Sequence, residues 1–506
     1  MAKTDKKFFI LIFLHLIVAL PFAYFLNIWV DEASTLHTTE HGFLQTFQTV
    51  FADEKQAPLY FLVLSLWRAL NDSIFFARLF SIVCSLLAIK VFYDLARRFW
   101  EDKTAFLVAA LFALHPYLIW ASLEIRLYSL VILFSVLLLK LFFEGYLSEE
   151  IFFAEPQISP RKTQIFFVLI SIAALYTNYY LGFLLVGNFA VLLVLRRWKT
   201  AKHYFLQMLI VAVSIVPLLL IIRQQFAVRN TAFHEQKPIV EGLRALWNHF
   251  LTFALPTELF TSGDASVVSI FRLWLVRLAI IAVSVILIKT RGKLFDNKIL
   301  ALGTIWAVCN LFLLIIYLLL GLKYVELRHS VTAFAPLILL LGLLLTKFLP
   351  KILRICAAVL YAIFFGYSIY MLYPNLAKRG DWAQVGAYLQ ENEKPNQPII
   401  VFRNYDALAL PYHYRGENKI LPDRNFFAWE AEAAPDSANV FEKQTEFIIA
   451  EIPSGAPEIW LLTEESCQKP ETQVACQPLE NFVEENYTVL ETKDFYLERV
   501  RLLRKK

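Results

Sequence analysis

Long apolar runs, each followed by a short polar or charged stretch, succeed one another along the first three quarters of the chain. A helix needs about 20 apolar residues to cross the hydrocarbon core of a bilayer. About eleven runs approach that length, and we expect each of them to form a transmembrane helix. They are 8–26, 74–95, 104–121, 127–143, 164–180, 181–195, 204–222, 267–288, 299–320, 331–348 and 353–373.

One further apolar run, 57–70, is only about two thirds of a span. It opens with Pro58 and contains Arg68, so we expect a helix that lies at the interface or re-enters the membrane. If it does not cross, all the basic clusters fall on one side, as the positive-inside rule requires. Those clusters lie at 3–7, 97–103, 161–162, 196–202, 289–298 and 347–354. The N-terminus is then cytoplasmic, and the loop 27–73 with its juxtamembrane helices is the first extracytoplasmic loop.

The composition agrees with a polytopic membrane protein. Of the 506 residues 58% are hydrophobic and 18% charged, whereas soluble chains have about 25% charged residues. After 373 the composition becomes that of a soluble protein. The pattern predicts strands at 399–402 and 458–462 and a helix at 382–390. We therefore expect a membrane domain over 1–373 and an extracytoplasmic α/β domain over 374–506, in a plasma (inner) membrane protein.

The sequence contains no recognisable site for a cofactor. The short cytoplasmic loops have no P-loop or Gly-rich dinucleotide fingerprint, which argues against a nucleotide-sugar donor. No His/Cys spacing resembles a metal site, so we expect no cofactor, do not favour a divalent metal, and expect no nucleic-acid partner. Cys467 and Cys476 would lie in an oxidising compartment; a disulfide and two free thiols both remain open.

Polar and ionisable residues gather at the outer ends of the apolar runs. Asp31 and Glu32 follow the first run, and charges near a membrane core are costly enough to suggest a function. Arginine suits phosphate oxygens, and a carboxylate can take a proton from an attacking alcohol. The other candidates at this face include Lys55, Glu124, Arg126, Tyr128, Asn178, Tyr179, Glu326, Arg328 and His329.

Several short motifs lie in these outer segments. They are Trp29-Val30-Asp31-Glu32-Ala33, Gln56-Ala57-Pro58-Leu59-Tyr60-Phe61, Ala77-Arg78-Leu79-Phe80-Ser81, Glu124-Ile125-Arg126-Leu127-Tyr128-Ser129, Tyr176-Thr177-Asn178-Tyr179-Tyr180, Glu326-Leu327-Arg328-His329 and Gly380-Asp381-Trp382. As a set they resemble the GT-C membrane glycosyltransferases, in the branch of the protein O-mannosyltransferases and lipid A aminoarabinose transferases. The resemblance touches most of the chain and is strongest in its first quarter.

The resemblance implies transfer of a sugar from a polyprenyl-phosphate donor to a hydroxyl of a glycan, lipid or protein acceptor, with inversion at the anomeric carbon. Asp31 would be the general base, with Glu32 shaping the catalytic site. Lys55, Arg126 and Arg328 would bind the lipid phosphate. Tyr128 and Tyr179 are further candidates for the substrate site, with a place in the aromatic belt at the membrane interface as the alternative.

Two departures from the family pattern suggest a different acceptor side. Gln56-Ala57-Pro58 stands before Leu59 where many relatives have His-Pro-Pro or Pro-Pro, and Asn178 stands where many have His. A transporter or flippase for lipid-linked sugars, or a non-catalytic envelope assembly protein, are the alternatives.

Overall fold

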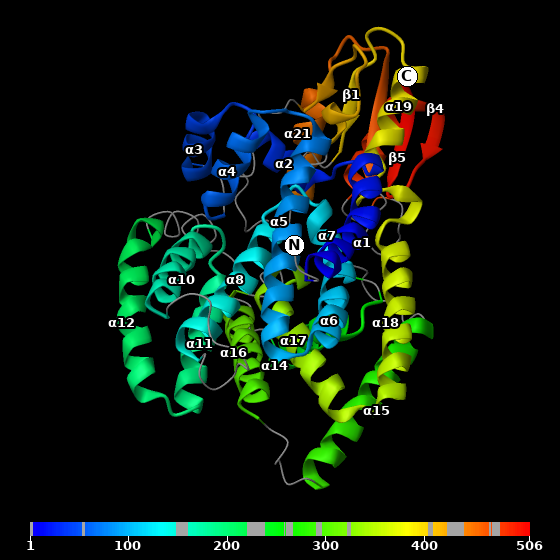
Figure 1. The fold of residues 1–506 in the computed structure, drawn as a ribbon. Coiled ribbons are helices and arrows are strands. Elements are labelled where there is room, and N and C mark those ends of the chain that lie inside the picture. The colour runs from blue at the N-terminus through cyan, green and yellow to red at the C-terminus, as the bar shows by residue number, and fades with distance from the viewer. Residues whose placement is uncertain are drawn as a thin grey trace. The chain divides into compact units, whose positions relative to one another are not determined.

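The computed structural model describes residues 4–52, 56–147, 160–219, 238–257, 259, 267–289, 296–320, 325–402, 408–422, 440–464, 467 and 476–506. They form two compact units. The first comprises Met1–Ala23 and Thr38–Leu372, and the second Tyr24–His37 and Tyr373–Lys506. The segment Tyr24–His37 thus belongs to the same unit as the C-terminal region, although the sequence suggested that it was part of the membrane domain. Figure 1 traces the elements of both units.

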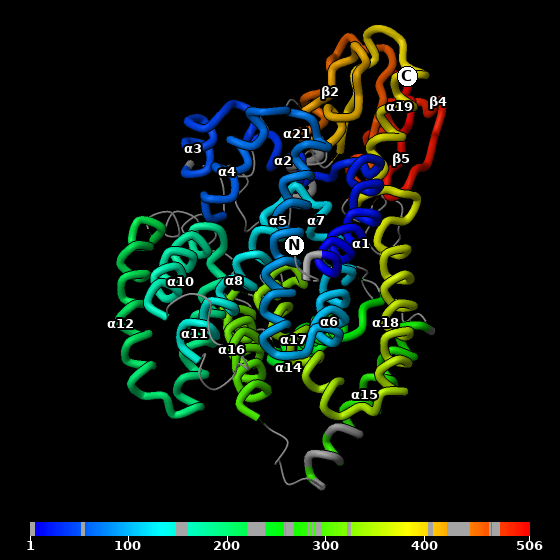
Figure 2. Tube along the Cα trace, viewed as in Figure 1, coloured from blue at the N-terminus to red at the C-terminus, as the bar shows by residue number. Residues whose placement is uncertain are grey.

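All the regular elements among the described residues of the first unit are helices (Figure 2). Its helices are α1 (Thr4–Phe25), α3 (Phe43–Ala52), α4 (Leu59–Arg68), α5 (Ile74–Phe99), α6 (Asp102–Leu114), α7 (Pro116–Leu123), α8 (Tyr128–Tyr146), α10 (Pro160–Leu175), α11 (Leu181–Val194), α12 (Trp198–Ser214), α14 (Ile239–Ala254), α15 (Val267–Lys289), α16 (Asn297–Leu320), the 3₁₀ turn η3 (Leu327–Ser330), α17 (Val331–Phe348) and α18 (Lys351–Leu372).

The predicted apolar runs form helices over most of their described residues, and the polytopic membrane fold is confirmed. Among the described residues, 6 helices are long and apolar enough to cross a membrane, and the pair α6 and α7, bent by 50°, would be a seventh. The helices α10, α11 and α12 have 16, 14 and 17 residues. They fall short of the usual length of a span, so the count of about eleven crossings stays a prediction.

Helix α8 lies at the core of the first unit. It is buried along most of its length and packs against α5, α10 and α17. Elsewhere α11 packs on α16, where a Cβ on Gly187 would lie 3.2 Å from the Cα of Ile305. Small residues permit such close backbone approach between membrane helices, which is why a glycine stands at this crossing.

The short run after Pro58 forms α4, which begins directly after that proline. Its 10 residues correspond to about 15 Å of helix, about half the thickness of the hydrocarbon core. Helix α4 is therefore too short to cross, which is the condition on which the predicted topology depends. The amide of Leu59 donates to the carbonyl of Tyr176 at 2.9 Å, which joins the start of α4 to the turn between α10 and α11.

The second unit contains a five-stranded mixed sheet in the order β2-β1-β3-β5-β4. Strands β2 (Ile420–Leu421), β1 (Ile399–Val401) and β3 (Glu458–Glu464) are parallel, and β5 (Glu498–Lys505) and β4 (Tyr487–Asp494) continue the sheet antiparallel. The other elements are α2 (Val30–Thr38), the 3₁₀ turns η4 (Pro374–Leu376) and η6 (Leu410–Tyr412), and the helices α19 (Trp382–Asn392), α21 (Val440–Glu451) and α22 (Gln477–Asn486). The predicted α/β character is confirmed, as are both predicted strands and the predicted helix.

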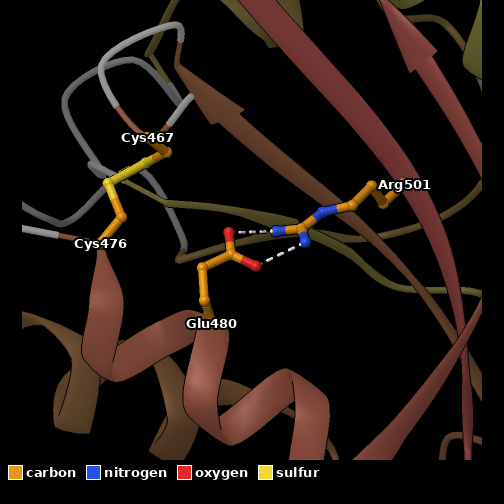
Figure 3. The surroundings of a disulfide bond; sticks show 4 residues. All are labelled: Cys467, Cys476, Glu480 and Arg501. Carbon is orange, nitrogen blue, oxygen red and sulfur yellow. Dashed lines mark hydrogen bonds and ion pairs between the residues drawn. A yellow bond between two sulfur atoms is a disulfide. The ribbon is translucent and has the colours of Figure 1, made fainter. Parts of the chain in front are cut away.

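Two cross-links join α22 to the rest of this unit (Figure 3). Cys476, at the start of α22, forms a disulfide with Cys467, so the structure decides between the two alternatives left open by the sequence. One turn later, Glu480 accepts two hydrogen bonds, at 2.6 and 2.7 Å, from the guanidinium of Arg501 on β5. Bidentate pairs of this kind are among the stronger ion pairs in proteins.

Candidate functional site

The carboxylate pair lies in the first turn of α2 in the second unit. The positive end of a helix dipole stabilises negative side chains there, and Asp31 and Glu32 both occupy this turn. The Glu32 carboxylate reaches back and accepts a hydrogen bond from the amide of Trp29 at 3.4 Å. This is one half of a capping box, so the sequence Trp-Val-Asp-Glu folds locally into a helix start.

The two carboxylates have different surroundings. Glu32 is 0% exposed, and its carboxylate accepts a hydrogen bond from the ammonium of Lys378 at 2.9 Å. Lys378 is itself only 3% exposed. Asp31, by contrast, is half-buried, and its backbone carbonyl accepts a hydrogen bond from the Thr35 hydroxyl at 3.0 Å. The buried ion pair thus engages Glu32 and leaves Asp31 as the more accessible carboxylate of the two.

Asn27 and Ile28, which precede α2, are bound to the C-terminal part of the same unit. The Asn27 amide donates to the carbonyl of Gly380 and accepts from the amide of Lys378, both at 3.0 Å. The amide of Ile28 donates to Nε2 of His413 at 3.3 Å. The segment that leads into α2 is therefore held by backbone and side-chain contacts from 378–380 and 413.

The segment 378–380 carries a second contact and a sharp bend. The Arg379 guanidinium lies over the Trp29 ring, 4.2 Å from its centre. Gly380 has a φ of +117°, and a Cβ there would lie 2.7 Å from Oε1 of Glu498. Only glycine adopts this conformation without strain, so Gly380 is what lets the segment turn against β5.

Two carboxyl groups beside this bend have raised pKa values. Burial raises the pKa of Asp381, and a hydrogen bond from the amide of Gln384 opposes that shift as Asp381 caps α19. Burial also raises the pKa of Glu498 well above its usual range, as does the neighbouring Glu464 carboxylate. Both groups therefore bind protons more readily than exposed carboxyls do.

Two of the predicted substrate residues meet in the first unit. The guanidinium of Arg328, in η3, lies 3.5 Å from the hydroxyl of Tyr128 at the start of α8. Arg328 also forms an ion pair with Glu326 at 2.8 Å, and Tyr128 stacks on Trp120, with 4.7 Å between ring centres. The sequence separates Tyr128 from Arg328 by 200 positions, and only the packing of α8 against α17 brings them together.

The remaining predicted residues lie in neighbouring turns of the first unit. Arg126, 7% exposed, lies in the turn between α7 and α8. The Ser81 hydroxyl fixes that turn by donating to the carbonyl of Glu124 at 2.6 Å. Tyr179 is half-buried in the turn before α11, where the adjacent Tyr180 stacks on His329 at 5.3 Å. Lys55 lies outside the described residues.

The predicted constellation is thus divided between the two units, with Asp31 and Glu32 in the second and the other described residues in the first. Sequence reasoning missed Lys378 and Asn27. A signal was available for Lys378, because a buried glutamate requires a nearby cation and Lys378 and Arg379 stand directly before the Gly380-Asp381-Trp382 motif. Within the described residues, no group of three or more His, Cys, Asp or Glu side chains is placed to hold a metal ion.

Comparison with solved structures assigns the fold. The crystal structure of ArnT from Cupriavidus metallidurans bound to undecaprenyl phosphate matches 99% of this chain and 98% of its own, with a TM-score of 0.54 and 15% identity. The chain has the fold of ArnT. The resemblance stated from the sequence motifs is thereby confirmed at the level of the fold.

A second solved structure is similar over most of this chain. It is the archaeal oligosaccharyltransferase AglB from Archaeoglobus fulgidus, in complex with an inhibitory peptide and a dolichol-phosphate. It covers 96% of this chain and 72% of its own, with a TM-score of 0.49 and 11% identity. No family model and no curated protein matches the sequence.

Proposed function

We propose that this protein is an integral membrane glycosyltransferase that moves a sugar from a polyprenyl-phosphate donor to an acceptor hydroxyl. The observation that carries the proposal is the match to ArnT over essentially the whole of both chains, in a structure bound to undecaprenyl phosphate. The apolar helices of the first unit agree with a substrate carried by a membrane lipid.

Asp31 is the proposed general base, and the displacement inverts the anomeric carbon. Its partial exposure at a helix start supports this role, because a base must reach the hydroxyl proton that it removes. Glu32 supports the reaction rather than accepting the proton, because its carboxylate is engaged by Lys378.

The lipid phosphate would be bound by the arginines of the first unit. Arg328 points one edge of its guanidinium at the Tyr128 hydroxyl, and a guanidinium can bind phosphate oxygens through two parallel hydrogen bonds. Arg126 and Lys55 would add positive charge, and Tyr128 and Tyr179 would line the substrate site. Stabilising the leaving phosphate electrostatically is the main catalytic contribution that such groups can make.

We place the reaction at the extracytoplasmic face of a plasma (inner) membrane, with the N-terminus in the cytoplasm. The one-sided basic clusters support this orientation, and so does the shortness of α4. The Cys467–Cys476 disulfide favours an oxidising compartment for residues 374–506. In this proposal residues 1–373 form the catalytic membrane domain, and the acceptor is a glycan, lipid or protein that receives a hexose or pentose.

The decisive experiment is mass spectrometry of the envelope glycans of a strain from which the gene has been deleted. Wild-type protein should restore a mass difference of one sugar, and Asp31→Asn should not restore it. Glu391→Gln, an exposed carboxylate on α19, is the control and should behave as wild type. A glycan profile that the deletion leaves unchanged would refute the transferase and favour a transporter or an assembly protein. Full restoration by Asp31→Asn would remove Asp31 as the base.

A further inference from the structure

A buried ion pair lies beside the proposed base. The Glu32 and Lys378 side chains are 0% and 2% exposed and lie 2.9 Å apart. The residues are 346 positions apart in the chain, so this contact joins the start of α2 to the segment that precedes α19. A buried charge without a partner is strongly destabilising, which makes each of these two residues dependent on the other.

The pair belongs to a larger set of contacts that act on one short segment. Asn27 is hydrogen-bonded to both Lys378 and Gly380, and the Trp29 ring packs against Arg379. Together with the ion pair, these contacts attach the segment 27–32 to 378–380 at its beginning, middle and end. Asp31 lies within that segment and one residue before Glu32.

We infer that Lys378 is a positioning residue of the proposed reaction: its ion pair with Glu32 holds the first turn of α2, and with it the Asp31 carboxylate, in the reactive geometry. The inference rests on the proposed function, since it assigns a purpose to a contact beside the base. A catalytic group misplaced by about 1 Å can lose about a hundredfold in rate. A buried ion pair at the adjacent residue is a direct means of preventing that loss.

A direct role for Lys378 in binding the lipid phosphate fits the geometry less well. Its side chain is 2% exposed, and its ammonium is already bonded to the Glu32 carboxylate. A lysine that binds substrate needs a face open to that substrate. The two roles predict different behaviour when both partners of the pair are replaced, because positioning requires a compatible pair whereas phosphate binding requires the cation.

The test compares Lys378→Met, Glu32→Gln and the double variant Glu32→Gln/Lys378→Met in the full chain. The readout is the rate at which the sugar appears on the envelope glycan after induced expression. Each single variant should slow transfer about a hundredfold. The double variant should recover to within about tenfold of wild type, since it leaves no unpaired charge buried in the unit. Lys419→Met, at an exposed lysine of the same unit, is the control and should leave the rate unchanged.

A second readout separates positioning from loss of fold or of lipid binding. The purified variants in detergent are titrated with undecaprenyl phosphate, and binding should stay within about threefold of wild type in all of them if Lys378 does not touch the lipid. A double variant as slow as Lys378→Met, or Lys378→Met with lost binding, would overturn the inference. So would a Lys378→Met protein that transfers at the wild-type rate. If instead Asp31→Asn itself is active, the proposed base fails, and that result is distinguishable from failure of the pair.

Discussion

Removal of the Cys467–Cys476 disulfide should destabilise the second unit, and the loss of stability can be calculated from the length of the loop that the disulfide closes. We replace both cysteines by alanine and compare the variant with the oxidised wild type. The two cysteines are 9 positions apart, and closing a loop of that length restricts the unfolded chain by about 3 kcal/mol. Both side chains also belong to the buried core cluster of the second unit, so their loss adds a packing cost of about 1 kcal/mol.

The loss of stability should be confined to the surroundings of α22, because the disulfide fixes the start of α22 close to the end of β3. Hydrogen exchange of the full-length protein in detergent, read by mass spectrometry, should show protection of α22 amides falling by about a hundredfold or more, which is about 3 kcal/mol of opening free energy. Amides of α8, in the first unit, should keep their protection. Cys356→Ala, at an exposed cysteine of α18, is the matched control and should change neither unit.

Alkylation gives an independent check on the same bond. The described residues include three free cysteines, Cys84, Cys309 and Cys356. In denaturant without reductant, an alkylating reagent should therefore label three cysteines, and with reductant all five. Labelling of five cysteines without reductant, or unchanged protection of α22 in the double variant, would refute the reasoning.

Three further predictions concern the two units. Arg328→Ala should weaken binding of undecaprenyl phosphate to the purified protein about tenfold or more. Arg415→Ala, at an exposed site, is the control and should not weaken it. Equal binding by the two variants would remove Arg328 from the phosphate site. Burial and the Glu464 carboxylate raise the pKa of Glu498 in the folded protein above its unfolded value near 4.5. The contribution of Glu498 to stability is therefore fully present below the unfolded pKa. It is lost as the pH rises through the folded pKa. Glu498→Gln should therefore reduce the fall in thermal unfolding midpoint between about pH 5 and about pH 8, and an unchanged pH dependence would contradict this. Gly380→Ala should destabilise the second unit by about 2 kcal/mol or more, because the new Cβ is strained at positive φ and would lie 2.7 Å from Glu498. The loss should appear as faster hydrogen exchange of the α2 amides. Exchange at the wild-type rates would contradict the prediction.

The membrane fold could be predicted from the sequence because its signal is local. Burial in a bilayer requires long apolar runs, and each such run is visible without knowing its neighbours. The same holds for α4, whose start follows from Pro58 and whose length follows from its short apolar run. In the second unit, the short hydrophobic runs that became β1 and β3 were equally readable.

The candidate site depended on contacts that no local pattern contains. Asp31 and Glu32 are adjacent in sequence and nearly equivalent there, yet one is half-buried and the other fully buried against Lys378. From the sequence alone, Tyr128 and Arg328 are each compatible with several roles. The packing of α8 and α17 brings their side chains together. The sequence by itself determined the helical membrane architecture and the residue types available for chemistry, because hydrophobic length and polar clustering are properties of a single segment. Only the tertiary structure decided which carboxylate is engaged and by which cation, because the ion pair that distinguishes them forms between residues that lie far apart in the chain.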